Sequence, residues 1–168
     1  MIDLRCGALP DVVVRPATPA DVDGVRDVAD QAYSVYVERI GRRPAPMDSD
    51  YLALIGQRRV WVAELEHQVV GILVLTWAHD HVQIDNVAVA AACRGHRIGH
   101  RLLQHAEEQA RIAGLAEVRL YTNEAMSENL TYYPRRGYRE THRATQDGYR
   151  RVFFAKAVRE GTTRAGQG

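Results

Sequence analysis

A basic, glycine-containing loop follows a short apolar run in the middle of the chain. The run is Val87-Ala88-Val89, and the loop is Cys93-Arg94-Gly95-His96-Arg97-Ile98-Gly99-His100. The loop opens a stretch with helical periodicity, so unpaired backbone N–H groups and the positive end of a helix dipole point to one place. The spacing therefore predicts a site for a phosphate or pyrophosphate group.

The loop departs from the two commonest nucleotide-binding signatures. It contains no GxxxxGK[ST] sequence, and no GxGxxG follows a first strand. Plain nucleotide binding stays open as an alternative, because a phosphate site does not identify the rest of its ligand.

Two histidine pairs have the spacing of potential metal ligands. His79 and His81 would share a strand face, and His96 and His100 lie one helical turn apart, but neither pair has a third ligand at a diagnostic spacing. We therefore expect no metal, and His96 and His100 would add hydrogen-bond donors near the phosphates. The cysteines, Cys6 and Cys93, fit neither a disulfide framework nor a metal knuckle, which indicates free thiols in a reducing cytosol.

The elements that position these residues follow from periodicity and from turn and cap signals. We expect a strand at Val12–Val14, a helix from Thr18 that ends before Gly41, a short helix at Ser49–Ile55, strands at Val60–Leu65, Val69–Trp77 and Val82–Ala90, a helix from Ile98 that stops at Gly114, a strand at Glu117–Thr122, a helix at Ser127–Arg136 that Pro134 bends, and strands at Tyr138–Thr141 and Arg151–Ala157. The order β-α-α-β-β-β-α-β-α-β-β predicts one mixed α/β domain at residues 12–158. Residues 1–11 and 159–168 are expected to be flexible.

Two stretches together resemble the GNAT superfamily of acyl-CoA-dependent N-acyltransferases. Arg94-x-x-Arg97-x-Gly99 is similar to that family's acetyl-CoA-binding motif, which has Arg or Gln, two residues, Gly, one residue, then Gly or Ala. Tyr133, four residues before Gly137-Tyr138, is similar to the tyrosine on the family's last helix. The resemblance covers residues 12–158 and implies a mostly antiparallel sheet flanked by helices.

The chain departs from the family pattern at two positions. Arg97 stands where the middle glycine of the motif is usual, so it must adopt a compatible backbone conformation or compensate with its guanidinium. Met126 stands where an asparagine is frequent, and Asn123 or Asn129 could supply the amide instead.

The resemblance implies that acetyl-CoA is the acyl donor. Its pyrophosphate would bind the loop formed by Arg94, Gly95, His96, Arg97, Ile98, Gly99 and His100. Its pantetheine arm would bind main-chain groups of Val87 and Val89, in a gap between their strand and the strand at Glu117–Thr122. Asn129 and Tyr133 would complete the cofactor site.

The resemblance also implies roles in catalysis. The attacking amine must be neutral, which costs a lysine-like amine roughly 4.6 kcal/mol at pH 7. Asp85 is the candidate base, directly or through water, because a carboxylate of ordinary pKa about 3.9 is weakly basic; His81 and water alone are rivals. The Val87 N–H would stabilise the oxyanion. Tyr133 would donate a hydrogen bond to the leaving sulfur, since full proton transfer from a phenol to a thiolate is uphill by about 2 kcal/mol.

The acceptor is less defined by the sequence. The segment from Tyr33 to Tyr51, which would wall the acceptor site with Tyr33, Tyr36, Asp85 and Asn123, mixes acids and bases. This mixture favours a small or amino-acid-like primary amine over polyamines or acidic substrates. A peptide N-terminus and a non-catalytic acyl-CoA sensor stay open. A net charge of +1 and the lack of an 18-residue apolar run indicate a cytoplasmic protein without nucleic-acid or membrane partners. The sequence leaves open whether the protein is a monomer or a homodimer.

Overall fold

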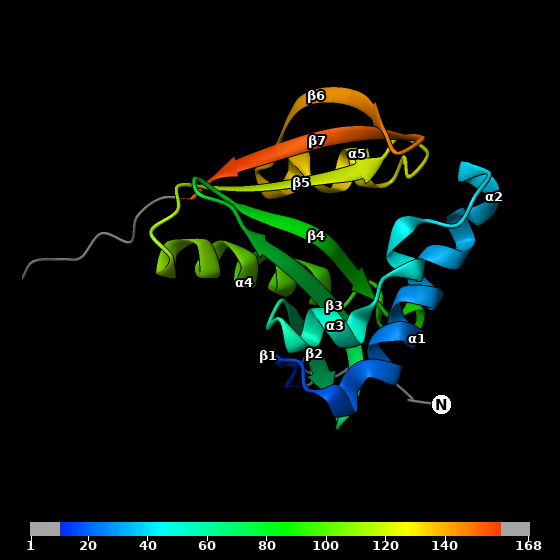
Figure 1. The fold of residues 1–168 in the computed structure, drawn as a ribbon, viewed down its shortest axis with the longest axis vertical. Helices are drawn as coiled ribbons and strands as arrows, with labels where there is room; N and C mark the ends of the chain where they lie inside the picture. The colour runs from blue at the N-terminus through cyan, green and yellow to red at the C-terminus, as the bar shows by residue number, and fades with distance from the viewer. Residues whose placement is uncertain (1–10, 159–168) are drawn as a thin grey trace, which may run out of the picture.

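A seven-stranded sheet with the order β1-β2-β3-β4-β5-β7-β6 runs through the molecule (Figure 1). The computed structural model describes residues 11–158, so the flexibility expected of residues 1–10 and 159–168, and the state of Cys6, lie outside the described residues. Only β4 and β5 are parallel neighbours; every other adjacent pair is antiparallel. The strands are β1 (Val13–Pro16), β2 (Val60–Leu65), β3 (Gln68–Trp77), β4 (Val82–Val89), β5 (Glu117–Asn123), β6 (Arg139–Gln146) and β7 (Tyr149–Ala157). This confirms the mixed, mostly antiparallel class.

Helices cover both faces of the sheet. α1 (Val22–Tyr33) and α3 (Tyr51–Gly56) pack on one face, and α4 (Ile98–Ile112) and α5 (Asn129–Tyr132) lie on the other (Figure 1). The segment between α1 and α3, residues 34–50, contains α2 (Val37–Ile40) and two short 3₁₀ turns, η2 (Ser34–Tyr36) and η3 (Ala45–Asp48). We call this segment the arm, because it projects beyond the sheet edge toward the β6–β7 turn.

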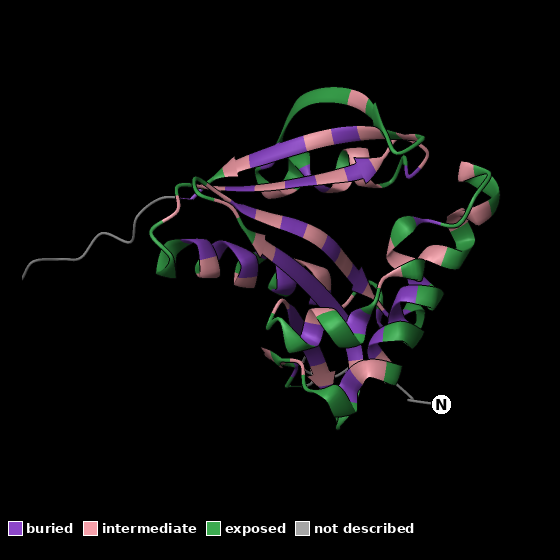
Figure 2. Ribbon diagram, in the orientation of Figure 1, coloured by how far each residue is buried: buried purple, intermediate pink, exposed green. Residues whose placement is uncertain are grey.

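The long helices are held by apolar stripes that the sequence already shows. In α4, residues Leu102, Leu103, Ala106 and Ala110 are buried against β3, β4 and β5, while the opposite side of the helix is exposed (Figure 2). Each fully buried leucine contributes about 1.5–3 kcal/mol relative to exposure, so the stripe fixes the rotation of the helix. That rotation directs the first turn of α4 toward the end of β4.

The start of α1 is tied to the sheet edge by an ion pair. Arg15 on β1 donates to both carboxylate oxygens of Asp21, at 2.8 and 2.9 Å, and Asp21 also accepts the Thr18 N–H at 2.7 Å. Arg15 pairs in addition with Glu64 on β2. The pKa of the Asp21 carboxyl falls to about 2, because Arg15 and the Thr18 N–H hold its charged form.

Several element boundaries differ from the sequence expectation. The first helix breaks into α1, η2 and α2, and α3 begins at Tyr51, where Asp50 caps it by accepting the Ala53 N–H at 3.0 Å. The last helix is α-helical only over Asn129–Tyr132, followed by a 3₁₀ turn at Pro134–Arg136 (η5), because proline lacks the N–H that a continuing helix needs. The closing strands β6 and β7 pair up to the Asp147-Gly148 turn, whose left-handed residues match hairpin twist.

Candidate active site

The two central strands separate to form an opening. The parallel pairing of β4 and β5 ends at Ile84 and Leu120, although β4 continues to Val89 and β5 to Asn123. Figure 1 shows the two strands diverging toward the side where α1 and the arm lie. A cavity of about 770 Å³ occupies this opening, a size common for small-molecule sites.

Main-chain groups of β4 face the opening. The Ala90 N–H bonds the Val70 carbonyl at 2.8 Å, so this antiparallel pair is a hydrogen-bonded one. Pairs alternate along the ladder, which makes Val87 and Val89, opposite Leu73 and Gly71, non-hydrogen-bonded positions. Their N–H and C=O groups therefore point away from β3, to the side from which β5 has separated. The register of β4 therefore leaves the main-chain polar groups of Val87 and Val89 free to bind a ligand, although both side chains are apolar.

The loop before α4 forms a concave set of backbone N–H groups. Gly95 and Arg97 both adopt left-handed conformations, with φ of 81° and 61°. Arg97 is the N-cap of α4, and Arg101 is the first helical residue whose N–H bonds within the helix, to the Arg97 carbonyl at 3.0 Å. The preceding N–H groups of the first turn stay available to an anion, as the sequence predicts. Arg97 therefore adopts a positive φ, which glycine adopts more readily than residues with a side chain.

Three arginines gather at this end of the cavity: Arg94, Arg97 and Arg136 line it. Arg136, from η5, was not singled out by the sequence reasoning, although it lies within the stretch from Tyr133 to Tyr138. Its guanidinium stacks 3.5 Å from the ring centroid of Tyr132 and donates to the Tyr132 carbonyl at 3.1 Å. Its Nε is buried without a hydrogen-bond partner among the described residues. The arrangement concentrates positive charge where an anion is expected.

The remaining loop residues differ in their exposure to the cavity. Ile98 and Gly99 line it, and a Cβ at Gly99 would lie 2.7 Å from the Tyr132 hydroxyl, so a larger residue there would require Tyr132 to shift. His96 and His100 are not among the lining residues; the His96 ring lies 3.0 Å from the Arg94 carbonyl. Burial, and then Arg136 and Arg97, lower the pKa of His100, which favours its neutral form.

Tyr133 lies at the centre of the cavity wall, within an aromatic cluster. Its ring packs against Tyr132, Tyr138 and Phe154, with centroid separations of 5.3, 6.0 and 5.6 Å. Its hydroxyl has no hydrogen-bond partner in residues 11–158 and is not sealed from the cavity. Burial raises the pKa of Tyr133 well above its ordinary value, so the group stays protonated as a hydrogen-bond donor.

Asp85 occupies a β-bulge in β4. Leu75 pairs with Ile84 and Val74 with Asn86, which leaves Asp85 as the extra residue. Its Oδ2 accepts hydrogen bonds from the Thr76 hydroxyl and from Arg59 Nη2, the latter at 2.9 Å. No hydrogen bond reaches its Oδ1 within the described part of the chain. The bulge turns a half-buried carboxylate into the cavity, but Arg59 already compensates its charge.

The end of the cavity away from the three arginines is formed by α1, the arm and β5. Tyr33 donates to Asn86 Oδ1 at 2.5 Å and lies 3.4 Å from the Val87 carbonyl, and the amide of buried Asn86 donates to Tyr51 at 2.8 Å. Tyr36 also lines the cavity. This network ties this wall of the cavity to the β4 segment whose main chain faces the opening.

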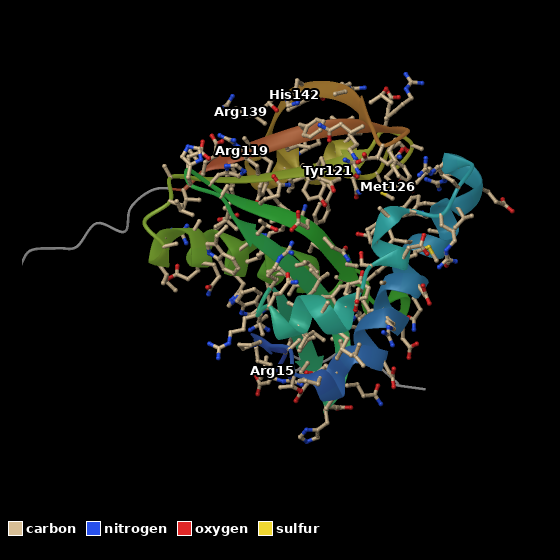
Figure 3. The ribbon with its side chains drawn as sticks, in the orientation of Figure 1. Arg15, Arg119, Tyr121, Met126, Arg139 and His142 are labelled. Carbon is tan, nitrogen blue, oxygen red and sulfur yellow. The ribbon has the colours of Figure 1, made fainter. Side chains whose placement is uncertain are left out.

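The two candidate asparagines make different contacts. Asn123 Oδ1 accepts the Ala125 N–H at 2.9 Å, and Asn129 Nδ2 donates to Thr122 at 2.8 Å. Both line the cavity, as does the buried Met126. Figure 3 shows Tyr121 and Met126 on the part of the molecule that borders the opening, whereas Arg119, Arg139 and His142 lie elsewhere on β5 and β6.

The two histidines between β3 and β4 lie outside the site. His79 and His81 do not line the cavity, and His81 Nδ1 lies 2.6 Å from Asp80. Within the described residues there is no group of three His, Cys, Asp or Glu side chains that could hold a metal ion. Cys93 is buried and not in a disulfide. In the same stretch, no helix combines the length and apolar composition needed to span a membrane.

Fold and site together define the class. A V-shaped opening between parallel strands, next to an anion-binding helix terminus, is the architecture expected of an acyl-CoA-dependent transferase. Consistent with this, the family model described as "Acetyltransferase (GNAT) domain" matches residues 56–140. The chain belongs to the GNAT acetyltransferase family and is an acyltransferase.

Individual relatives are more distant. An aminoalkylphosphonate N-acetyltransferase of Salmonella typhimurium is 38% identical over 60 residues, which cover 36% of this chain and 39% of that protein. Among solved structures, the PaiA N-acetyltransferase of Thermoplasma acidophilum in complex with coenzyme A has a TM-score of 0.74 at 16% identity, covering 88% of this chain and 99% of that one. A GNAT family acetyltransferase of Elizabethkingia anophelis with acetyl-CoA bound has a TM-score of 0.61 at 17% identity, covering 88% and 99%. These structures share the fold.

Proposed function

We propose that this acyltransferase moves an acetyl group from acetyl-CoA to the primary amine of a small or amino-acid-like acceptor, by direct attack in a ternary complex. The observation that carries the proposal is one continuous cavity that has arginines and free backbone N–H groups at one end, a tyrosine hydroxyl without a hydrogen-bond partner among the described residues in its wall, and a second end walled by α1 and the arm. The N-acetyltransferase relative is named for a small amine, an aminoalkylphosphonate.

The residues at the cationic end fit the acyl donor. The pyrophosphate would take the backbone N–H groups of residues 95–100 and the guanidinium groups of Arg94, Arg97 and Arg136. The pantetheine arm would take the place of the missing β5 strand and hydrogen-bond Val87 and Val89. Asn129, held against Thr122, would offer its free amide oxygen to the same arm.

Asp85 would prepare the amine for attack. Arg59 already occupies Oδ2 of this carboxylate, so the proton would leave the ammonium through water bound at the open Oδ1. The remaining cost of forming a neutral lysine-like amine, about 4.6 kcal/mol at pH 7, falls as the pH rises toward the amine pKa. The acetylation rate is therefore expected to increase with pH.

The charge that develops during transfer would meet two donors. The Val87 N–H would stabilise the oxyanion formed from the thioester carbonyl. Tyr133 would donate a hydrogen bond to the departing sulfur and keep its own proton, because burial has raised its pKa further above that of a thiol.

The arm favours a small acceptor over a peptide. Tyr149 on β7 donates to the Arg43 carbonyl at 2.7 Å, and Arg42 donates to the Asp147 carbonyl at 3.1 Å. An extended peptide crossing this side of the cavity would have to break these contacts between the arm and the β6–β7 turn.

The proposal is tested by acetyl-CoA-dependent thiol release across a panel of small primary amines and short peptides, with product mass as confirmation. Turnover of small amines is expected. Tight acetyl-CoA binding without turnover of any acceptor would instead indicate a sensor, and stabilisation by ATP but not by coenzyme A would indicate nucleotide binding.

A further inference from the structure

The acceptor end of the cavity contains a guanidinium that the acetyl-transfer steps do not use. Arg151 on β7 lines the cavity, and its side chain is 11% exposed. Its guanidinium carbon lies 4.3 Å from the ring centroid of Tyr121 and 5.7 Å from that of Tyr149. A guanidinium is more weakly hydrated than an ammonium, so it tolerates such contact with aromatic rings, and the two rings limit where it can lie.

The donors of Arg151 are only partly used by the protein. Nη1 donates to Gln146 at 3.0 Å and lies 3.5 Å from Asp147, whose side chain is 81% exposed at the hairpin turn. Nε and Nη2 meet no acceptor among residues 11–158, and neither is sealed from solvent. Two N–H groups on adjacent corners of a held guanidinium match the geometry of a carboxylate or phosphonate.

Neither carboxylate in the cavity wall is paired with Arg151. The lining carboxylates are Asp85 and Glu128. Asp85 is paired with Arg59, and Glu128 is paired with Arg39 at 2.7 Å. Both lining carboxylates are therefore already paired with arginines, so a second positive charge on the acceptor would gain little, whereas an anionic group would gain a direct partner in Arg151.

The register of the sheet places Arg151 close to the reacting centre. Arg151 is directly opposite Asn123 on β5, and their side chains share one face of the sheet. Asn123 Nδ2 has no partner in the described chain and can add a donor. β7, which carries Arg151, is the strand next to β5 on the side away from the opening, and neighbouring strands lie about 5 Å apart. A short acceptor in the opening could therefore reach the guanidinium.

We infer that Arg151, with Asn123 beside it, binds an anionic group of the acceptor, so that the substrate class is short primary amines that also carry a carboxylate or phosphonate. This inference rests on the proposed acetylation of a small amine, and it adds the protein group, Arg151, that would select among such amines. Tyr121 and Tyr149 orient Arg151 and do not contact the reacting atoms.

The test compares short primary amines with and without an anionic group: 3-aminopropanoate and 2-aminoethylphosphonate against 3-aminopropanamide and propylamine, each assayed at an equal concentration of free amine. For the unmodified protein, kcat/KM for the two anionic acceptors is expected to exceed that for the neutral pair by about 10- to 100-fold. The ratio between the carboxylate and the phosphonate shows which anion fits better.

The variant Arg151→Gln is expected to remove this preference through KM for the anionic acceptors, with unchanged rates for propylamine. Arg151→Lys should be intermediate, because it keeps the charge and loses the fork. Arg150→Gln is the matched control: this neighbour is exposed and pairs with Glu124 outside the cavity wall. An equal thermal shift with coenzyme A in all variants reports that the fold and the donor site are intact.

Equal kcat/KM for charged and neutral acceptors, or an unchanged preference in Arg151→Gln, would overturn the inference and leave the proposed function standing. If the protein acetylates none of the panel, the proposed function fails, and the thermal shift produced by 3-aminopropanoate or 2-aminoethylphosphonate in the presence of coenzyme A decides the inference. A shift that Arg151→Gln abolishes supports an anion site; a shift that is absent or independent of Arg151 overturns it.

Discussion

Replacing Arg97 by glycine should raise the stability of the protein and weaken its binding of coenzyme A. Arg97 has a φ of 61°, a left-handed conformation that costs a residue with a side chain about 1–2 kcal/mol. Glycine removes that cost but loses roughly 0.5–1 kcal/mol through the greater freedom of the unfolded chain. The net gain is about 0–1.5 kcal/mol, or a rise in Tm of up to about 6 °C for a domain of this size.

The effect on coenzyme A has the opposite sign. The Arg97 guanidinium lines the cationic end of the cavity with Arg94 and Arg136. A charge-assisted hydrogen bond to a phosphate contributes about 1.5–3 kcal/mol, so Kd for coenzyme A should rise by about 10- to 150-fold. Thermal unfolding of the free protein and calorimetric titration with coenzyme A measure the two effects separately.

A second substitution at the same position separates backbone from charge. Arg97→Ala loses the guanidinium but keeps a Cβ at positive φ, so it should bind coenzyme A as weakly as Arg97→Gly and unfold at a lower temperature. Arg101→Ala, which removes a positive charge of α4 outside the cavity wall, should leave the affinity within about twofold. Unchanged affinity in Arg97→Gly would refute the role of the guanidinium, and equal stability of the glycine and alanine variants would refute the strain.

Two further predictions concern catalysis and acid stability. Tyr133→Phe should lower kcat by about 10- to 100-fold, because it removes one hydrogen bond to the developing thiolate, while KM for acetyl-CoA barely changes; steady-state kinetics measures both. Acidification should destabilise the fold through Asp21, whose pKa of about 2 is lower than in the unfolded chain. The stabilisation, about 2 kcal/mol, is complete above about pH 5 and is lost as the pH falls toward 2, which urea unfolding at pH 6 and pH 3 would detect.

The catalytic prediction and the acid-stability prediction each have a matched control variant. Tyr138→Phe makes the same change in the same aromatic cluster, but Tyr138 faces Glu107, 3.4 Å away, and does not line the cavity, so kcat should be retained. Full kcat in Tyr133→Phe would exclude that residue from the mechanism. Asp21→Asn should lower stability at pH 6 and flatten the pH dependence; an equally steep acid loss in this variant would place its origin elsewhere.

Individual helices and turns could be predicted from the sequence because the signals that specify them lie within a few residues of each other. The apolar stripe of α4 and the turn at Asp147-Gly148 depend on neighbours in the chain, and both appear where expected. The expected helix boundaries were wrong where a local signal allows more than one structure. A proline near a helix end can bend the helix or convert its final turn to 3₁₀ geometry, and Pro134 did the latter.

The loop at residues 94–99 and the spacing of Tyr133 from Gly137 were determined by the sequence itself, because each is a contiguous pattern whose chemistry follows from residue type and separation. The tertiary structure decided which groups meet across the sheet. The exit of Val87 and Val89 main-chain groups into the opening depends on the register with β3, and the pairing of Asp85 with Arg59 depends on a bulge. Arg136 and Arg151 reach the two ends of the cavity only because η5 and β7 fold against it. Such contacts are set by strand register and helix rotation, which many long-range apolar contacts fix jointly and no short stretch of sequence encodes alone.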